Sequence, residues 1–122
     1  MKWEIKMTGT CMLSSIGTYK SLQYKEAGVY ILKINNNIQK VGSAKIGIKK
    51  RMQQYYNLNR WCGLNKYINT NNRDLIEVTF QTCKKKECRE LESKLFDKYG
   101  IQNMPWAKRR PHSKKNTVQL LI

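Results

Sequence analysis

Residues 28–42, GVYILKINNNIQKVG, contain two short apolar stretches on either side of three consecutive asparagines. The apolar positions are rich in valine, isoleucine and tyrosine, which favour strands over helices in stretches this short. Asparagine tolerates the left-handed backbone that closes a tight turn. The pattern therefore predicts a β-hairpin, and residues 35–37 are a candidate three-residue loop.

The register of this hairpin decides whether two ionisable side chains meet. With a three-residue loop, Tyr30 pairs with Gly42 and Leu32 pairs with Lys40, so these four positions share one face of the sheet. Tyr30 and Lys40 are then diagonal neighbours, and the ammonium is expected to lower the pKa of the phenol from its usual value of about 10. A two-residue turn would move the two side chains to opposite faces.

Two later stretches show the spacing of amphipathic helices. Between residues 46 and 57, Ile48, Met52 and Tyr55 fall on one face while lysines and an arginine occupy the others. Residues 84–99 give the clearest helix, and Gly100 is expected to end it. Its apolar stripe consists of Cys88, Leu91, Leu95 and Tyr99.

The remaining pattern is weaker. Residues 58–68 are predicted to form a second helix, and the alternating residues 75–80 a strand. Residues 3–7 are a candidate strand, and residues 8–18 resemble a loop with two glycines. The order β-β-α-α-β-α predicts a small α+β domain with a mainly antiparallel sheet. At 122 residues, one domain spanning the whole chain is expected, with a basic C-terminal arm over 104–122 whose last five residues dock on the domain.

Charge narrows the choice of partners. Lysine and arginine number 24 against 8 acidic residues, which gives a net charge of +16. Nucleic acid is the expected polyanion, because no basic amphipathic helix points to a membrane surface. The chain shows no membrane-spanning stretch and no signal peptide, and its four cysteines contain no CxxC pair. We therefore expect a cytoplasmic protein with reduced thiols and no zinc site.

Several enzyme classes are excluded by what the sequence lacks. The single histidine, His112, rules out histidine-rich metal nucleases and a two-histidine ribonuclease mechanism. There is no GxxxxGK[ST] loop and no GxGxxG motif, so classical nucleotide-binding folds are not indicated. Any metal-dependent reaction must draw its carboxylates from only eight acidic residues.

Two charged residues border the apolar stripes of the predicted helices. Arg51 lies beside Met52, where its guanidinium can clamp a phosphate through two hydrogen bonds. Glu92 lies beside Leu91, and a carboxylate there is a candidate ligand for Mg²⁺, which takes few protein ligands and completes its shell with phosphate and water. An alternative is a D…ExK nuclease pattern formed by Asp74, Glu92 and Lys94, although this segment is predicted as helix rather than strand.

In this order, Tyr30, Lys40, Arg51 and Glu92 give the chain a resemblance to the GIY-YIG nuclease family, including its restriction and phage endonuclease II-like members. The segment GVY (28–30) stands for the first family motif and KVG (40–42) for the second. The arginine follows on the first helix and the glutamate on the later one. The resemblance covers about residues 27–107, and it implies a three-stranded antiparallel sheet flanked by helices.

The resemblance also implies a reaction. Family members hydrolyse phosphodiester bonds in DNA with one divalent metal ion per active site, here Mg²⁺ or Mn²⁺, leaving 5′-phosphate and 3′-hydroxyl ends. Carried over, Tyr30 would act as general base, Arg51 would stabilise the scissile phosphate, and Glu92 would hold the metal. Lys40 replaces the first tyrosine of the second motif.

The family asparagine has two candidate positions. Asn103 follows Glu92 by eleven residues and is preferred slightly. The segment MPWAKR (104–109) also resembles a family PPWN motif, which would place Ala107 where the asparagine is expected. The loss of that side chain would weaken activity.

Basic residues outside the predicted site are expected to contact the DNA backbone, and dimerisation is expected for double-strand cleavage. Two alternatives remain: a non-catalytic basic nucleic-acid-binding module on the same scaffold, and a ribosome-associated structural protein. The predicted backbone contacts are Lys45, Lys49, Arg60, Lys108, Arg109, Arg110, Lys114 and Lys115.

Overall fold

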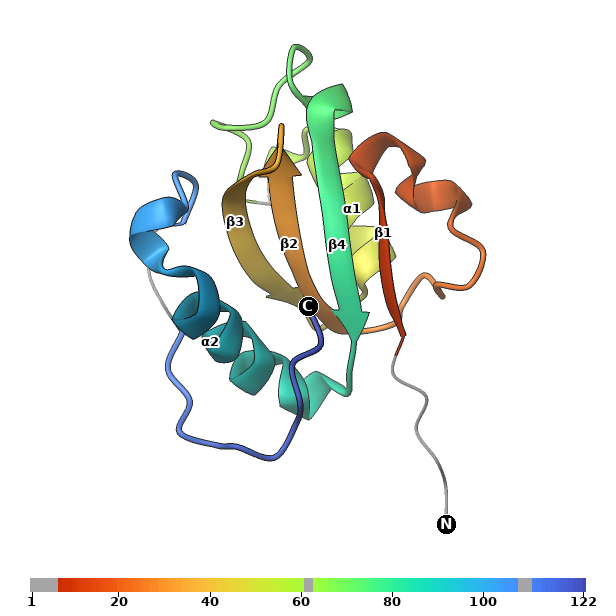
Figure 1. The fold of residues 1–122 in the computed structure, drawn as a ribbon. Helices are drawn as coiled ribbons and strands as arrows, with labels where there is room; N and C mark the ends of the chain where they lie inside the picture. The colour runs from red at the N-terminus through yellow and green to blue at the C-terminus, as the bar shows by residue number, and fades with distance from the viewer. Residues whose placement is uncertain (1–6, 61–62, 108–110) are drawn as a thin grey trace.

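The computed structural model describes residues 7–60, 63–107 and 111–122, and shows an antiparallel sheet between two helices (Figure 1). The four strands lie in the order β1-β4-β2-β3 and every neighbouring pair is antiparallel. Helix α1 covers one face, while α2 and the C-terminal residues cover the other. The predicted α+β class with an antiparallel sheet is therefore confirmed. The elements are β1 (Thr8–Met12), β2 (Gly28–Ile34), β3 (Asn37–Ala44), α1 (Ile48–Tyr56), β4 (Ile76–Thr82) and α2 (Cys88–Tyr99).

The expectation of three strands is wrong, because residues 8–12 form a fourth strand. Strand β1 pairs with β4 along its whole length, from Thr8 opposite Gln81 to Met12 opposite Glu77. It is an edge strand that buries little apolar surface, so its pattern resembles a loop. Gly9 permits the pairing, since a Cβ atom there would lie 2.7 Å from the Phe80 ring.

The hairpin has the predicted pairing at its base but a different turn. Asn35 and Asn36 have φ angles of 51° and 66°, and Ile34 pairs with Asn37, so the turn has two residues rather than three. The register then shifts between Leu32 and Lys33, which leaves Gln39 as the extra residue of a β-bulge. The bulge restores the predicted pairs, Leu32 with Lys40 and Tyr30 with Gly42.

Both main helices form where they were predicted, but the helix expected at 58–68 does not. Leu58 has a φ of 59°, and the described part of this stretch is turn and coil apart from Arg60, which is in a 3-10 conformation. Leu64 and Ile68 have helical spacing and are both buried, but a single backbone bond from Ile68 N–H to Leu64 O joins them. None of the described helices is long and apolar enough to cross a membrane.

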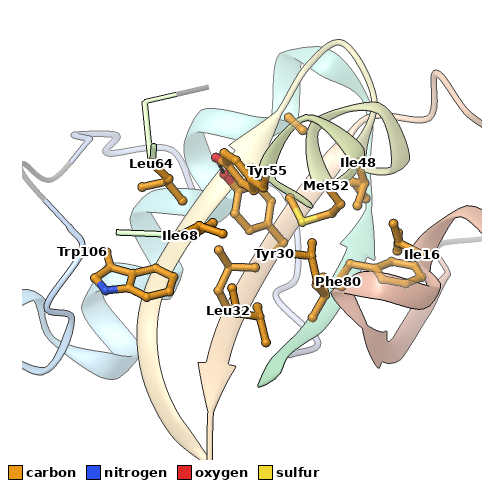
Figure 2. Packing of buried hydrophobic residues seen from close by; sticks show 14 of the residues in the cluster. Ile16, Tyr30, Leu32, Ile48, Met52, Tyr55, Leu64, Ile68, Phe80 and Trp106 are labelled. Carbon is orange, nitrogen blue, oxygen red and sulfur yellow. Dashed lines mark hydrogen bonds between the residues drawn. The ribbon is translucent and has the colours of Figure 1, made fainter. Parts of the chain in front are cut away.

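The sheet separates two hydrophobic clusters. The cluster under α1 is the larger, and Figure 2 shows its packing around Tyr30 and Phe80. The cluster under α2 is completed by the end of the chain, where Val118 is buried. The second cluster consists of Val29, Ile31, Val41, Leu91, Leu95, Phe96, Met104 and Val118.

The last residues are docked on the domain, as predicted for 118–122. The buried side-chain amide of Gln81 on β4 donates to the carbonyl of Gln119 at 2.8 Å and accepts from the N–H of Leu121 at 2.7 Å. The Gln81 side-chain amide thus donates one hydrogen bond to the backbone of the tail and accepts one from it, as the backbone of a neighbouring strand does.

Candidate active site at the edge of the sheet

Tyr30 reaches the outer edge of the sheet by lying across a glycine. Its side chain is 2% exposed and points to the α1 face. Gly42 lies opposite it on β3, which is an edge strand of the sheet. A Cβ atom at Gly42 would be 2.6 Å from the Tyr30 hydroxyl oxygen. The glycine of the KVG segment therefore makes room for the ring and lets the hydroxyl extend past β3.

A second tyrosine holds this hydroxyl. The hydroxyl oxygens of Tyr30 and Tyr55 lie 2.6 Å apart, and the two rings meet edge to face with centroids 6.0 Å apart (Figure 2). The sequence pattern identified Tyr55 only as part of an apolar stripe. Its position four residues after Arg51, on the same side of α1, was the available signal that it belongs to the site.

The pKa of Tyr30 identifies its charged neighbours. Burial raises the pKa of the Tyr30 hydroxyl well above its usual value of 10, and the hydrogen-bonded Tyr55 and the charge of Glu92 raise it further. The guanidinium of Arg51 acts in the opposite direction. Arg51 on α1 and Glu92 on α2 therefore both lie near enough to Tyr30 to act on its ionisation, although they come from opposite faces of the sheet.

The predicted lowering of the Tyr30 pKa by Lys40 is wrong. Lys40 does occupy the predicted face and is half-buried. It lies two residues nearer the turn than Gly42, about 7 Å along the strand, whereas the tyrosine hydroxyl is directed over Gly42. Burial and the neighbours Tyr55 and Glu92 outweigh the positive charge that reaches the phenol.

Glu92 reaches the same edge from the other face. Its carboxylate accepts a hydrogen bond of 2.5 Å from the hydroxyl of Ser43, the residue after Gly42. Because Ser43 pairs with Val29, it faces α2, while its neighbour Gly42 faces Tyr30. Leu91 and Leu95 anchor α2 in the second cluster and so fix the place of Glu92. Ser43 was missed by the sequence pattern, because its role depends on a partner 49 residues away.

Glu90, two residues before Glu92 on α2, binds the C-terminal tail to the domain. Glu90 is 3% exposed and accepts bonds from the N–H and hydroxyl of Thr117 and from the N–H of Val118. Burial acts to raise the pKa of Glu90, but these bonds, together with Lys94, outweigh it and lower the pKa to about 2. Glu90 therefore binds the tail as a carboxylate.

A metal at Glu92 would have few protein ligands. In the part of the chain that the structure describes, no group of three histidine, cysteine, aspartate or glutamate side chains could hold an ion. The half-buried carboxylate of Glu92 is compatible with Mg²⁺ all the same, since that ion is commonly held by one or two carboxylates and takes its other ligands from phosphate and water. The site thus fits a metal that binds together with a phosphate.

Asn103 lies at the turn end of the hairpin, away from this group. Its side-chain amide donates to the carbonyl of Tyr99 at 2.9 Å, and it lines an open cavity of about 430 Å³ with residues 36–39. The nearest of these strand residues, Gln39, is three positions, about 10 Å, from Gly42. Ala107 instead follows Trp106, whose N–H bonds to Gln39 O on the outer edge of β3. Both candidate segments therefore lie beside the turn half of β3, since Asn103 lines the cavity with Gln39 and Trp106, next to Ala107, bonds to Gln39.

The acidic and basic members of the alternative D…ExK pattern have separate partners. Asp74 accepts a bond from Tyr56 at 2.8 Å, whereas Lys94 reaches Glu90 and the tail. The segment that carries Glu92 is helical, as predicted.

The cations predicted to contact DNA differ in how accessible they are. Lys45 is exposed in the loop before α1, three residues after Gly42. Lys49 donates to the carbonyl of Tyr19 at 2.9 Å and is thereby bound to the N-terminal part of the domain. Arg60, Lys114 and Lys115 are exposed, and Lys108, Arg109 and Arg110 lie outside the described residues.

No protein-family model, curated protein or solved structure matches the chain.

Proposed function

We propose that this chain is a small metal-dependent DNA endonuclease of the GIY-YIG type, with Tyr30, Arg51 and Glu92 as its catalytic residues. The observation that carries the proposal is that the Tyr30 hydroxyl lies over Gly42 while Glu92 bonds to Ser43, the next residue of β3. The electrostatic effects of Arg51 and Glu92 on Tyr30 support it, as does the bond from Ser43 to Glu92 beside Gly42. The net charge of +16 favours a polyanionic substrate.

The raised pKa of Tyr30 constrains how it can act. Because the Tyr30 phenol is buried and bonded to Tyr55, it is protonated at pH 7, and the resting protein does not contain a Tyr30 phenolate. Tyr30 accepts the proton of the attacking water while its own proton passes to Tyr55 along the 2.6 Å contact, and the Tyr55 hydroxyl gives up its original proton to solvent, so that both phenols end neutral. A cation bound at Glu92 would cancel the negative charge that helps to raise the pKa of Tyr30.

In this proposal, Arg51 and Glu92 stabilise the scissile phosphate, one directly and the other through a metal ion. The guanidinium stabilises the charge that builds on the phosphoryl oxygens as water attacks phosphorus and the bond to the 3′ oxygen breaks. The carboxylate of Glu92 would hold Mg²⁺ or Mn²⁺, which supplies Lewis-acid stabilisation of the leaving oxygen. The leaving oxygen is protonated from solvent, so the products carry a 5′-phosphate and a 3′-hydroxyl.

Exposed cations of the described residues would hold the DNA backbone. Lys45, Arg60, Lys114 and Lys115 are available for such contacts. Binding that depends on phosphate contacts weakens steeply as salt is raised, because counterions are released when the protein binds. Cleavage of both strands by one small domain calls for a homodimer, which analytical ultracentrifugation with and without duplex DNA would detect.

A second candidate is a non-catalytic nucleic-acid-binding module on this scaffold. Ala107 favours it, because a methyl group stands at one of the two positions where the resemblance places an asparagine. This candidate predicts that the protein binds DNA equally well with and without Mg²⁺ and cleaves nothing.

Plasmid cleavage separates the two candidates. Supercoiled plasmid is incubated with wild type, Tyr30→Phe and Glu92→Gln, each with Mg²⁺ and with EDTA. We expect nicking or linearisation by wild type with Mg²⁺ only, and a loss of roughly 10²-fold or more in both variants. Tyr24→Phe and Glu77→Gln are matched controls, because Tyr24 is an exposed phenol and Glu77 is a carboxylate of β4, a strand that does not pair with β3. Equal cleavage by all five proteins would refute the proposal.

A further inference from the structure

Two cysteines outside the candidate active site lie with their sulfur atoms in contact. Cys83 directly follows β4 and its N–H donates to the carbonyl of Ala27. Cys88 is the first residue of α2. The two Sγ atoms are 3.5 Å apart, although the residues belong to different elements. Only a short 3-10 helix, Lys85–Glu87, separates them in the chain.

The two thiols differ in exposure, as attacking and resolving thiols do. Cys88 is fully buried, with its Sγ 3.6 Å from the carbonyl of Lys84 and 3.9 Å from that of Gly28. Cys83 is half-buried and so can be reached from solvent. The hydrogen bond from Cys83 lowers the pKa of the Cys88 thiol, with burial acting against this and the charge of Lys45 assisting it.

We propose that Cys83 and Cys88 form a redox-modification site that reacts with low-molecular-weight disulfides such as oxidised glutathione. The Cys83 thiolate attacks one sulfur of the reagent, a mixed disulfide forms, and the first glutathione leaves as a thiolate that takes up the proton lost by Cys83. The Cys88 thiolate then attacks the Cys83 sulfur and expels the second glutathione in the same way. Two protein thiols are oxidised to one disulfide, and one oxidised glutathione is reduced to two glutathione molecules.

The bond would link the end of β4 to the start of α2. Closing it requires the sulfur atoms to approach from 3.5 Å to about 2.05 Å, a movement within the range of side-chain rotation. The bond would lie one helical turn before Glu92, so it would fix the part of α2 that leads to the candidate active site. This inference does not depend on the proposed nuclease activity.

Mass spectrometry of the wild-type protein tests the site directly. The folded protein is incubated with oxidised glutathione, alkylated and digested with trypsin, which cleaves after Lys84 and Lys86 and so separates the two cysteines. We expect peptides 74–84 and 87–89 to be joined by a disulfide, with the intact protein lighter by two hydrogen atoms. A stable glutathione adduct, or no reaction of either cysteine, would overturn the proposal.

Two variants assign the order of the steps. Cys88→Ser is expected to accumulate a glutathione adduct on Cys83, because the resolving thiol is gone. Cys11→Ser is the matched control, since Cys11 is half-buried on β1 and burial raises the pKa of its thiol. It should form the 83–88 bond at the wild-type rate. The oxidised wild type should keep a cooperative thermal transition at or above that of the reduced form, since a disulfide restricts the unfolded chain. Loss of that transition would show that the bond forms only outside the native fold.

Discussion

Glu90 and Glu92 are two carboxylates on one helix that the fold treats in opposite ways. Two residues apart on α2, they point about 200° apart around the helix axis. Glu90 is surrounded by Thr117, Val118 and Lys94, whose bonds occupy the roughly four acceptor positions of a carboxylate. Glu92 accepts a bond from Ser43 at the half-exposed edge of the sheet and keeps acceptor positions for a ligand. Residue type alone therefore does not identify a functional acid. The number of protein donors around it is the better guide.

The largest expected effect is on the cleavage rate and comes from replacing Glu92, the glutamate with acceptor positions left for a ligand. Glu92→Gln should lower Mg²⁺-dependent plasmid cleavage by roughly 10²- to 10³-fold, because the metal and the transition-state charge lose their carboxylate. The melting temperature should stay close to wild type, since one partly exposed bond to Ser43 is affected. Initial cleavage rates and thermal unfolding measured on the same preparation check both parts. A large fall in melting temperature would assign Glu92 to structure instead.

The matching change on the side of structure is Glu90→Gln. It should lower the free energy of unfolding by roughly 2–4 kcal/mol, because a buried carboxylate that accepts three bonds from the tail is replaced by an amide with one acceptor. The cleavage rate per folded molecule should remain near wild type. Urea unfolding, with Glu77→Gln as the control, measures the effect. If Glu90→Gln abolished cleavage in the folded protein, the division between the two glutamates would fail.

A smaller effect on stability and cleavage is expected at Gly42, which lies under the Tyr30 ring and next to Ser43, the partner of Glu92. Gly42→Ala would place a methyl group 2.6 Å from the Tyr30 hydroxyl, so the ring must move and its bond to Tyr55 must lengthen. We expect a cost of roughly 1–3 kcal/mol in stability, together with reduced cleavage. Gly17→Ala is the control, because the added methyl group there meets only the end of the Gln53 side chain. Equal stability and activity in the two variants would show that Tyr30 does not need its position over β3.

The elements predictable from the sequence were those with local, periodic signals. The hairpin, both main helices and the pairing of Tyr30 with Gly42 could be inferred in this way. The pairing was nevertheless reached through the wrong turn, because the pattern does not reveal that a bulge at Gln39 compensates for a two-residue loop. Strand β1 was missed because an edge strand that buries little has no strong alternation.

The contacts that define the candidate site could not be predicted in the same way. Ser43 and Glu92 are 49 residues apart, and Glu90 meets the tail across 27 residues. Such pairs depend on how α2 lies against the sheet, which local spacing does not specify. The direction of the Tyr30 pKa was mispredicted for the same reason, since burial and Glu92 reach the phenol through tertiary contacts.

The last expected effect is a pH dependence of stability that comes from Glu90. Its pKa is about 2 in the folded protein against 4.5 for an unperturbed glutamate. Between these values the unfolded chain binds a proton that the folded protein does not, so stability falls as pH falls. The contribution is complete above pH 4.5 and is lost as pH drops through about 2. Urea midpoints of wild type and Glu90→Gln, measured from neutral pH downward, should differ by a constant amount above pH 4.5 and converge below it. A difference that stayed constant down to pH 2 would mean that the tail is held by contacts other than an ionised carboxylate, and the contrast with Glu92 would then lose its electrostatic basis.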